Sequence, residues 1–166
     1  DLMWQDSKSF NLSSDDLFGI KTKAFMFTSG VNTEYYEKGT DSWQKASICK
    51  MNKNWRSIKG SQWVWISEAA TLGEVKTGTK KRFRLMLNLP PDCRDECVVR
   101  ADLFLRSNDE CRININGASI NQGYGGANYP DPFIVGIGRY LKGGENVIYF
   151  ELISFVKPDT KEVEDN

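Results

Sequence analysis

The sequence predicts an all-β fold in which two antiparallel sheets pack face to face as a sandwich. Several segments alternate apolar and polar residues with a period of two, which places successive side chains on opposite faces of a strand. Turns rich in glycine, proline and asparagine separate these segments. The sequence shows no long apolar stripe at helical spacing, so we expect helices to be few and short. At 166 residues the chain is long enough for one domain with a substantial core.

The N-terminal part of the chain predicts little regular structure. Residues 1–17 are polar and turn-rich and are interpreted as an arm that leads into the domain. The segment 18–28 contains IKTKAFMF, a predicted strand, and the segment 30–42 is interpreted as a loop. The domain is predicted to span residues 18–157, and residues 158–166 are interpreted as a C-terminal tail or linker.

Four later segments have the clearest strand pattern. In 82–89, phenylalanine and leucine alternate with arginine, methionine and asparagine, and a proline pair ends the run because proline cannot donate to a ladder. The segments 98–106, 111–117 and 144–154 show the same alternation. The side chains expected in the shared interior are Phe83, Leu85, Leu87, Val99, Ala101, Leu103, Leu105, Ile113, Ile115, Ile148, Phe150 and Leu152. The cluster expected on a solvated face consists of Lys76, Lys80, Lys81, Arg82 and Arg84.

Composition disfavours several classes of function. The 22 basic and 22 acidic side chains cancel, whereas a nucleic-acid binder usually needs surplus positive charge to displace counterions from phosphates. No apolar run approaches the roughly 20 residues that a membrane-spanning helix requires. The chain has no histidine, which removes the commonest general base and the commonest metal ligand. We therefore expect no nucleic-acid partner, no membrane span and no enzymatic activity.

Four motifs between residues 62 and 154 occur in the order found in one known fold family. QWVWIS (62–67) resembles the family's Trp-x-Trp strand, and RFRLMLNL (82–89) resembles the strand that follows it. RININGASI (112–120) resembles a hairpin with an Asn-Gly bend, and GGENVIYFEL (143–152) resembles the closing strand. On these motifs the chain resembles the galactose-binding-like domains, the jelly-roll β-sandwiches found beside many glycoside hydrolases and in many carbohydrate-binding modules.

The resemblance implies a galactose-binding-like jelly roll and a non-catalytic role in recognising a carbohydrate or glycan. The module would belong to a larger secreted or cell-surface protein, such as one used in adhesion, and adjacent domains of that protein are further expected partners. The motifs are mostly turn and core residues, which specify a fold better than a ligand. A protein-interaction or structural module without sugar binding is therefore the alternative.

Strand direction predicts where the binding residues lie, because alternate antiparallel connections fall at the same end of a sandwich. The connections expected at one end are those before Trp63, after Leu89 and after Asn116. The connections expected at the other end are those near Thr77, Asn108 and Gly143. Sugars bind to aromatic faces and to planar polar groups that bridge hydroxyls, and the first end is the richer in both. The predicted ligand-binding residues are Trp55, Asn121, Gln122, Tyr124, Asn128, Tyr129 and Asp131.

Two further expectations accompany this assignment. Tyr149, on the outer face of the final strand, is expected to take no part in binding. No cofactor is required, but the resemblance implies room for a structural calcium ion between the first and last strands. Calcium takes hard oxygen ligands, and the candidates are Asp41 and Glu151, although no spaced Asp/Asn/Gly loop accompanies them.

The four cysteines do not have zinc-site spacing, because CRDEC separates its thiols by three residues and lacks a matched second pair. Cys93 and Cys97 are the candidates for a local disulfide between two strand ends, and Cys111 lies in phase with apolar neighbours as a candidate buried thiol. Cys49 and Cys111 are predicted to lie too far apart to pair.

If the protein is extracellular, thiol titration under denaturing, non-reducing conditions should find the Cys93 and Cys97 thiols oxidised and those of Cys49 and Cys111 free. Four free thiols would contradict the local disulfide. No free thiol would contradict the separation of Cys49 from Cys111.

Overall fold

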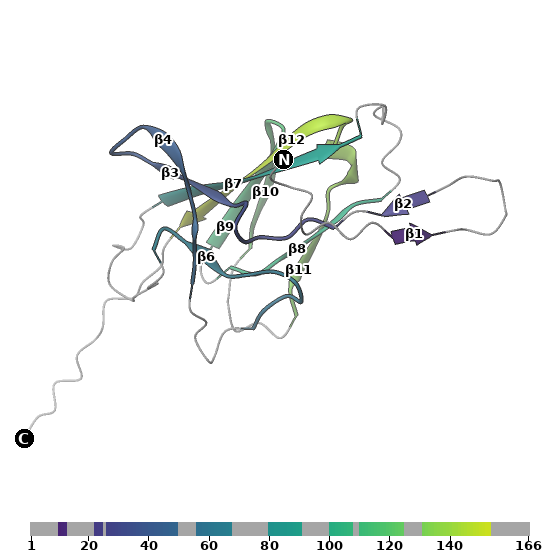
Figure 1. Cartoon of the computed structure of the whole chain (residues 1–166), viewed down its shortest axis with the longest axis horizontal. Coiled ribbons are helices and arrows are strands. Elements are labelled where there is room, and N and C mark those ends of the chain that lie inside the picture. The colour runs from purple at the N-terminus through teal and green to yellow at the C-terminus, as the bar shows by residue number, and fades with distance from the viewer. Residues whose placement is uncertain are drawn as a thin grey trace, which may run out of the picture.

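In the described part of the chain, the strands form one large antiparallel sheet and three two-stranded ribbons, arranged as Figure 1 shows. The computed structural model describes residues 10–12, 22–24, 26–49, 56–67, 80–90, 100–107, 110–124 and 131–153. The strands of the large sheet, from one edge to the other, are β10 (Ala118–Tyr124), β9 (Glu110–Ile115), β12 (Gly144–Ile153), β7 (Lys80–Leu89), β3 (Glu34–Glu37) and β4 (Ser42–Lys45). The ribbons pair β1 (Phe10–Leu12) with β2 (Thr22–Ala24), β5 (Ser47–Ile48) with β6 (Val64–Trp65), and β8 (Asp102–Leu105) with β11 (Phe133–Gly136).

The fold is all-β, as predicted. Every strand pair in the described part of the chain is antiparallel, and the helical structure there is the single 3-10 turn η1 (Gly138–Tyr140). No helix among the described residues is long and apolar enough to cross a membrane.

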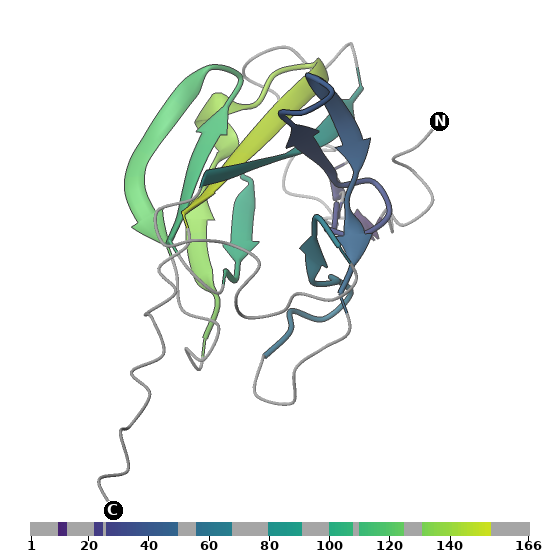
Figure 2. The same ribbon diagram turned by 90° about the vertical axis from the view of Figure 1, so that its left-hand side faces the viewer.

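The core lies between the large sheet and two of the ribbons (Figure 2). Its buried residues are Leu85, Leu87, Leu89, Ile113, Ile115, Ile137, Leu141 and Ile148. Side chains of the β8–β11 ribbon pack against this cluster, and the Trp65 ring of β6 stacks on Phe83 of β7 at 5.7 Å. The layered arrangement follows from the period-two pattern, which gives the large sheet one apolar face.

Most of the predicted interior residues are buried or pack against the core. Phe83, like the three leucines of β7, is buried, and Ala101, Leu103, Leu105 and Phe150 pack against the main cluster. Leu152 is only half-buried, and Ile153 beside it is buried instead. Val99 lies outside the described residues.

Two segments near the N-terminus differ from the prediction. The segment 30–42 was expected to be a loop, but it contains β3 and the start of β4, joined by a turn in which Asp41 has φ 51°. Part of the predicted arm forms β1, which pairs with β2. The hairpin was missed because its strands are only four residues long, too short to establish a period-two pattern, although their tyrosine and tryptophan residues favour strands.

The prediction of which connections share an end was wrong in two places. The register pairs Gly144 with Leu89 and Ile148 with Ile115, so the turns at Gly143 and Asn116 lie at the same end. Tyr124 pairs with Cys111 at the opposite end. The prediction failed because residues 118–124 form β10 rather than a loop. This additional strand moves each later connection to the end of the sheet opposite to the one predicted.

A buried amide fixes the end of the sheet that contains Asn116 and Gly144. The side chain of Asn146 is fully buried; its Oδ1 accepts from the backbone N–H of Lys142 and from Nδ2 of Asn116, both at 2.8 Å. Its Nδ2 donates to the carbonyls of Lys142 at 2.8 Å and Gly144 at 3.1 Å. Asn116 in turn donates to the carbonyl of Tyr140 and accepts from the N–H of Val147. These bonds join the β9–β10 turn, η1 and the start of β12.

Replacing Asn146 with alanine should lower the free energy of unfolding by roughly 3 kcal/mol, because it leaves several buried polar groups without partners. Chemical denaturation of the wild type and variant measures this loss. Asn88→Ala is the matched control, since Asn88 is exposed on β7 at the same end, and it should change stability by less than about 0.5 kcal/mol. Equal effects of the two substitutions would contradict the role of the buried amide.

Candidate functional site

The structure does not bring the seven predicted ligand-binding residues together in one described site. Trp55, Asn128 and Tyr129 lie outside the described residues. The other four are divided between β10, which contains Asn121, Gln122 and Tyr124, and the exposed position Asp131 before β11. The end that was expected to collect them is therefore not the end at which β10 finishes.

The candidate calcium ligands have other partners. Asp41 accepts a hydrogen bond from the hydroxyl of Tyr36, and Glu151 is 3.6 Å from both Lys80 Nζ and Arg82 Nε. Among the described residues, no group of three or more acidic or cysteine side chains is placed to hold a metal ion.

A cluster of aromatic side chains on the outer face of the large sheet is the strongest candidate site. Alternation along β7 puts Phe83 in the core and Arg84 on the outer face, and the registers place Glu34 and Tyr149 beside Arg84. Trp43 on β4 lies opposite Tyr36 on β3. Four strands therefore contribute to one patch.

Trp43 is the centre of this patch, which we call the outer-face cluster: Glu34, Tyr36, Trp43, Arg84 and Tyr149. The guanidinium of Arg84 lies 4.3 Å from the centroid of the Trp43 ring, a cation–π distance. Tyr149 contacts the same ring at 5.8 Å, and Tyr36 meets it edge-on at 5.5 Å. Arg84 Nε also donates to Glu34 at 2.6 Å, which orients its planar group over the ring.

The outer-face cluster contains the chemistry of a sugar site. Its three rings are half-buried, so each is held by neighbours and still reaches solvent. Aromatic faces pack against the C–H patches of a sugar ring, and the guanidinium and carboxylate have donors and acceptors suited to hydroxyl pairs. Side chains on a sheet are also held more rigidly than those on loops.

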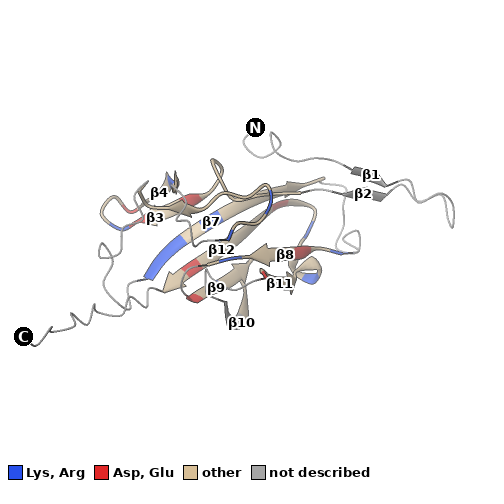
Figure 3. Ribbon diagram, turned by 90° about the horizontal axis from the view of Figure 1, so that it is seen from below, with Lys and Arg blue, Asp and Glu red and all other residues tan. Residues whose placement is uncertain are grey.

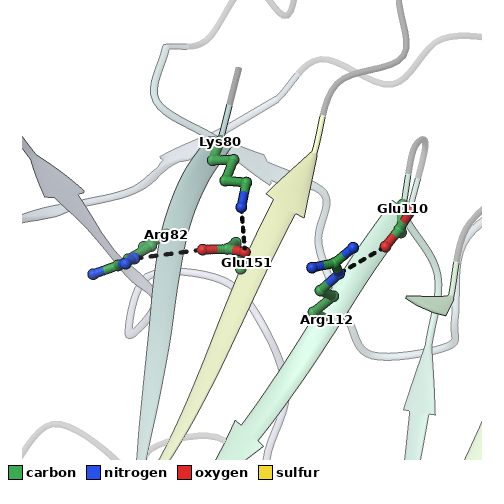
Figure 4. A network of polar contacts seen from close by, with 5 residues as sticks. All are labelled: Lys80, Arg82, Glu110, Arg112 and Glu151. Carbon is green, nitrogen blue, oxygen red and sulfur yellow. Dashed lines mark hydrogen bonds and ion pairs between the residues drawn. The ribbon is translucent and has the colours of Figure 1, made fainter. Parts of the chain in front are cut away.

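Charged positions lie on the neighbouring strands β7, β12 and β9 (Figure 3), and the registers place a second group of polar residues on the same face as the outer-face cluster, toward Lys80. The registers place Arg82, Glu151 and Arg112 side by side on β7, β12 and β9. Arg112 Nε lies 2.8 Å from Glu110. We call Lys80, Arg82, Glu110, Arg112 and Glu151 the charged row (Figure 4).

Sequence reasoning missed the outer-face cluster because it interpreted 30–42 as a loop and therefore left Tyr36 and Trp43 without strand partners. One signal was present: EYYE and SWQK flank the turn sequence KGTD, which favours a hairpin.

No protein-family model, curated protein or solved structure matches this chain. The chemistry of the site therefore has to be inferred from the arrangement of its own residues.

The described cysteines behave as core residues rather than as reactive groups. Cys49 and Cys111 are both free and buried, which confirms that they do not pair; Cys93 and Cys97 lie outside the described residues. Burial raises the pKa of both thiols, and for Cys111 burial together with the negative charge of Glu110 raises the pKa to about 12. The thiolate is the nucleophile, so neither thiol is activated.

Cys111 should resist a thiolate-selective disulfide reagent in the native protein at pH 8 and react once the protein is unfolded. Peptide mass spectrometry after timed labelling measures the rate, with a cysteine introduced at exposed Lys59 as the reactive reference. Because the folded state favours the neutral thiol, its contribution to stability is complete below about pH 9 and is lost as the pH rises toward 12. Native labelling of Cys111 at the reference rate would contradict its burial.

Proposed function

We propose that this chain is a non-catalytic carbohydrate-binding module with a galactose-binding-like jelly roll, part of a secreted or cell-surface protein. The observation that carries the proposal is the Trp43 ring held between Arg84, Tyr36 and Tyr149 on the outer sheet face. The layered antiparallel strands, the Asn116-Gly117 hairpin and the buried Asn146 are consistent with the family resemblance.

The proposed binding site is the outer-face cluster, and the sequence-predicted binding residues, such as Trp55 and Tyr124, are the rival location. Aromatic stacking should supply most of the affinity, because hydrogen bonds to sugar hydroxyls replace bonds to water and contribute little net free energy each. The earlier expectation that Tyr149 takes no part is the reverse of what this geometry favours, since Tyr149 contacts Trp43.

Trp43→Ala should weaken the binding of any glycan ligand by about 1–3 kcal/mol, because it removes the central ring. For a site of millimolar to micromolar affinity, this loss makes binding almost undetectable. A glycan array identifies the ligand, and calorimetry with that glycan compares the variants. Tyr149→Ala should have a smaller effect in the same direction.

The controls separate the two locations. Phe104→Ala removes an exposed aromatic side chain from the β8–β11 ribbon and should leave affinity unchanged. Trp55→Ala and Tyr124→Ala test the sequence-predicted binding residues. Each variant must keep the thermal midpoint of the wild type, which shows that it is folded. If these two substitutions abolish binding and Trp43→Ala does not, the sheet-face location is wrong.

A protein-interaction module is the second candidate, and one observation favours it. Phe104 and Ile134 face each other across β8 and β11, and they are 50% and 61% exposed. Exposed apolar pairs of this kind occur at contact surfaces between proteins. Absence of saturable binding to every glycan tested would favour this alternative.

A further inference from the structure

The positive groups of the charged row are more exposed to solvent than its negative groups. The side chains of Lys80, Arg82 and Arg112 are 55%, 66% and 56% exposed, whereas those of Glu151 and Glu110 are 24% and 27% exposed. Figure 4 shows that each carboxylate is in contact with at least one of these cationic groups. A ligand that approaches this face meets positive charge first.

The row also has a small surplus of positive charge. It contains three cations and two carboxylates, and the neighbouring Arg84 is balanced by Glu34. The whole chain has equal numbers of basic and acidic side chains, so this surplus is local to the row. Each contact of an arginine with a glutamate in the row is made through Nε, and a guanidinium has five N–H donors.

We propose that the outer sheet face binds a polysaccharide of uronic acids, with sugar rings stacked on the outer-face cluster and their carboxylates bound by Arg82 and Arg112. This proposal rests on the carbohydrate-binding function proposed above and specifies its ligand class. Carboxylates form paired, planar hydrogen bonds with guanidinium groups, which gives both affinity and orientation.

The modest charge surplus favours a sparsely charged ligand. A uronic acid chain has one carboxylate per sugar, so each ring still has an uncharged face that can stack on Trp43 or Tyr149. A sulfated polysaccharide or a single-stranded nucleic acid brings denser charge and usually needs a larger excess of basic groups. The intervening Glu151 and Glu110 would repel such a ligand.

The extent of the face favours a chain rather than a single sugar. The outer-face cluster and the charged row together run from β4 to β9, across five adjacent strands. Strands lie about 4.8 Å apart, so the surface is roughly 19 Å wide. The two groups are also neighbours along each strand, because Arg82 and Arg84 on β7, and Tyr149 and Glu151 on β12, are consecutive positions on the same face.

The test uses two ligands with the same sugar backbone: an oligogalacturonate and its fully methyl-esterified form, in which each carboxylate is replaced by a neutral ester. Calorimetry at low salt should show tighter binding of the acidic form. Arg82→Gln combined with Arg112→Gln should weaken oligogalacturonate binding by about tenfold or more and leave the neutral ester unaffected. Trp43→Ala should weaken the binding of both forms.

Lys142→Gln is the matched control, because Lys142 is exposed and precedes β12 at the opposite end of the sheet, beside Leu89. It removes one positive charge from the protein and should leave both affinities unchanged. If the double arginine variant fails to fold, salt provides the same test in the wild type. Raising the ionic strength should weaken binding of the acid and not of the ester.

The outcomes distinguish this proposal from the function on which it rests. Equal binding of the acid and the ester, with no effect of the arginine substitutions, overturns the uronic acid assignment and leaves carbohydrate binding intact. Tighter binding of chondroitin sulfate or oligothymidylate than of oligogalacturonate overturns the choice of a sparse carboxylate ligand. No binding of any glycan overturns both proposals.

Discussion

The contact between Asn116 and Asn146 is the constraint on which the rest of the large sheet depends. Asn146 is buried and binds both backbone groups of Lys142, so it shapes the turn that leads into β12. Asn116 binds Val147 through its side chain and its backbone N–H, which fixes β9 against β12. A slip of one residue would exchange the two faces of a strand, and these bonds oppose that slip.

The strand register fixed at that end determines which side chains lie on the outer face of the sheet. With Ile148 and Phe150 directed to the core, Tyr149 and Glu151 face outward beside Arg84 and Arg82. The same alternation that buries the apolar face therefore lines up the aromatic and charged side chains on the other. The pairing of β12 with β7 forms both the core and the outer-face cluster. A shift of this register should therefore disrupt both.

The sequence predicted the core better than the site, and the reason is physical. Core strands such as β7 and β9 repeat their pattern over six to ten residues, which is enough to establish the phase. The outer-face cluster depends on β3 and β4, which are four residues each and become strands through pairing with β7 and with each other. β10 contains Asn121 and Gly123, which are uncommon in strands, and it was taken for a loop. β3 and β4 are too short for a period-two pattern to identify them, and β10 contains poor strand formers, so pairing with neighbouring strands determines all three.

A binding site on the outer sheet face requires little ordering of its side chains when a ligand binds. A site on a sheet face uses side chains already held by neighbours, as Arg84 is held by Glu34 and Trp43, so little side-chain freedom is lost when a sugar binds. In the complex proposed above, a ligand carboxylate at Arg82 or Arg112 would have to share the guanidinium with Glu151 or Glu110, which would limit the affinity. Stacking on Trp43 would then supply most of the affinity, and the charged row would mainly select which chain binds there.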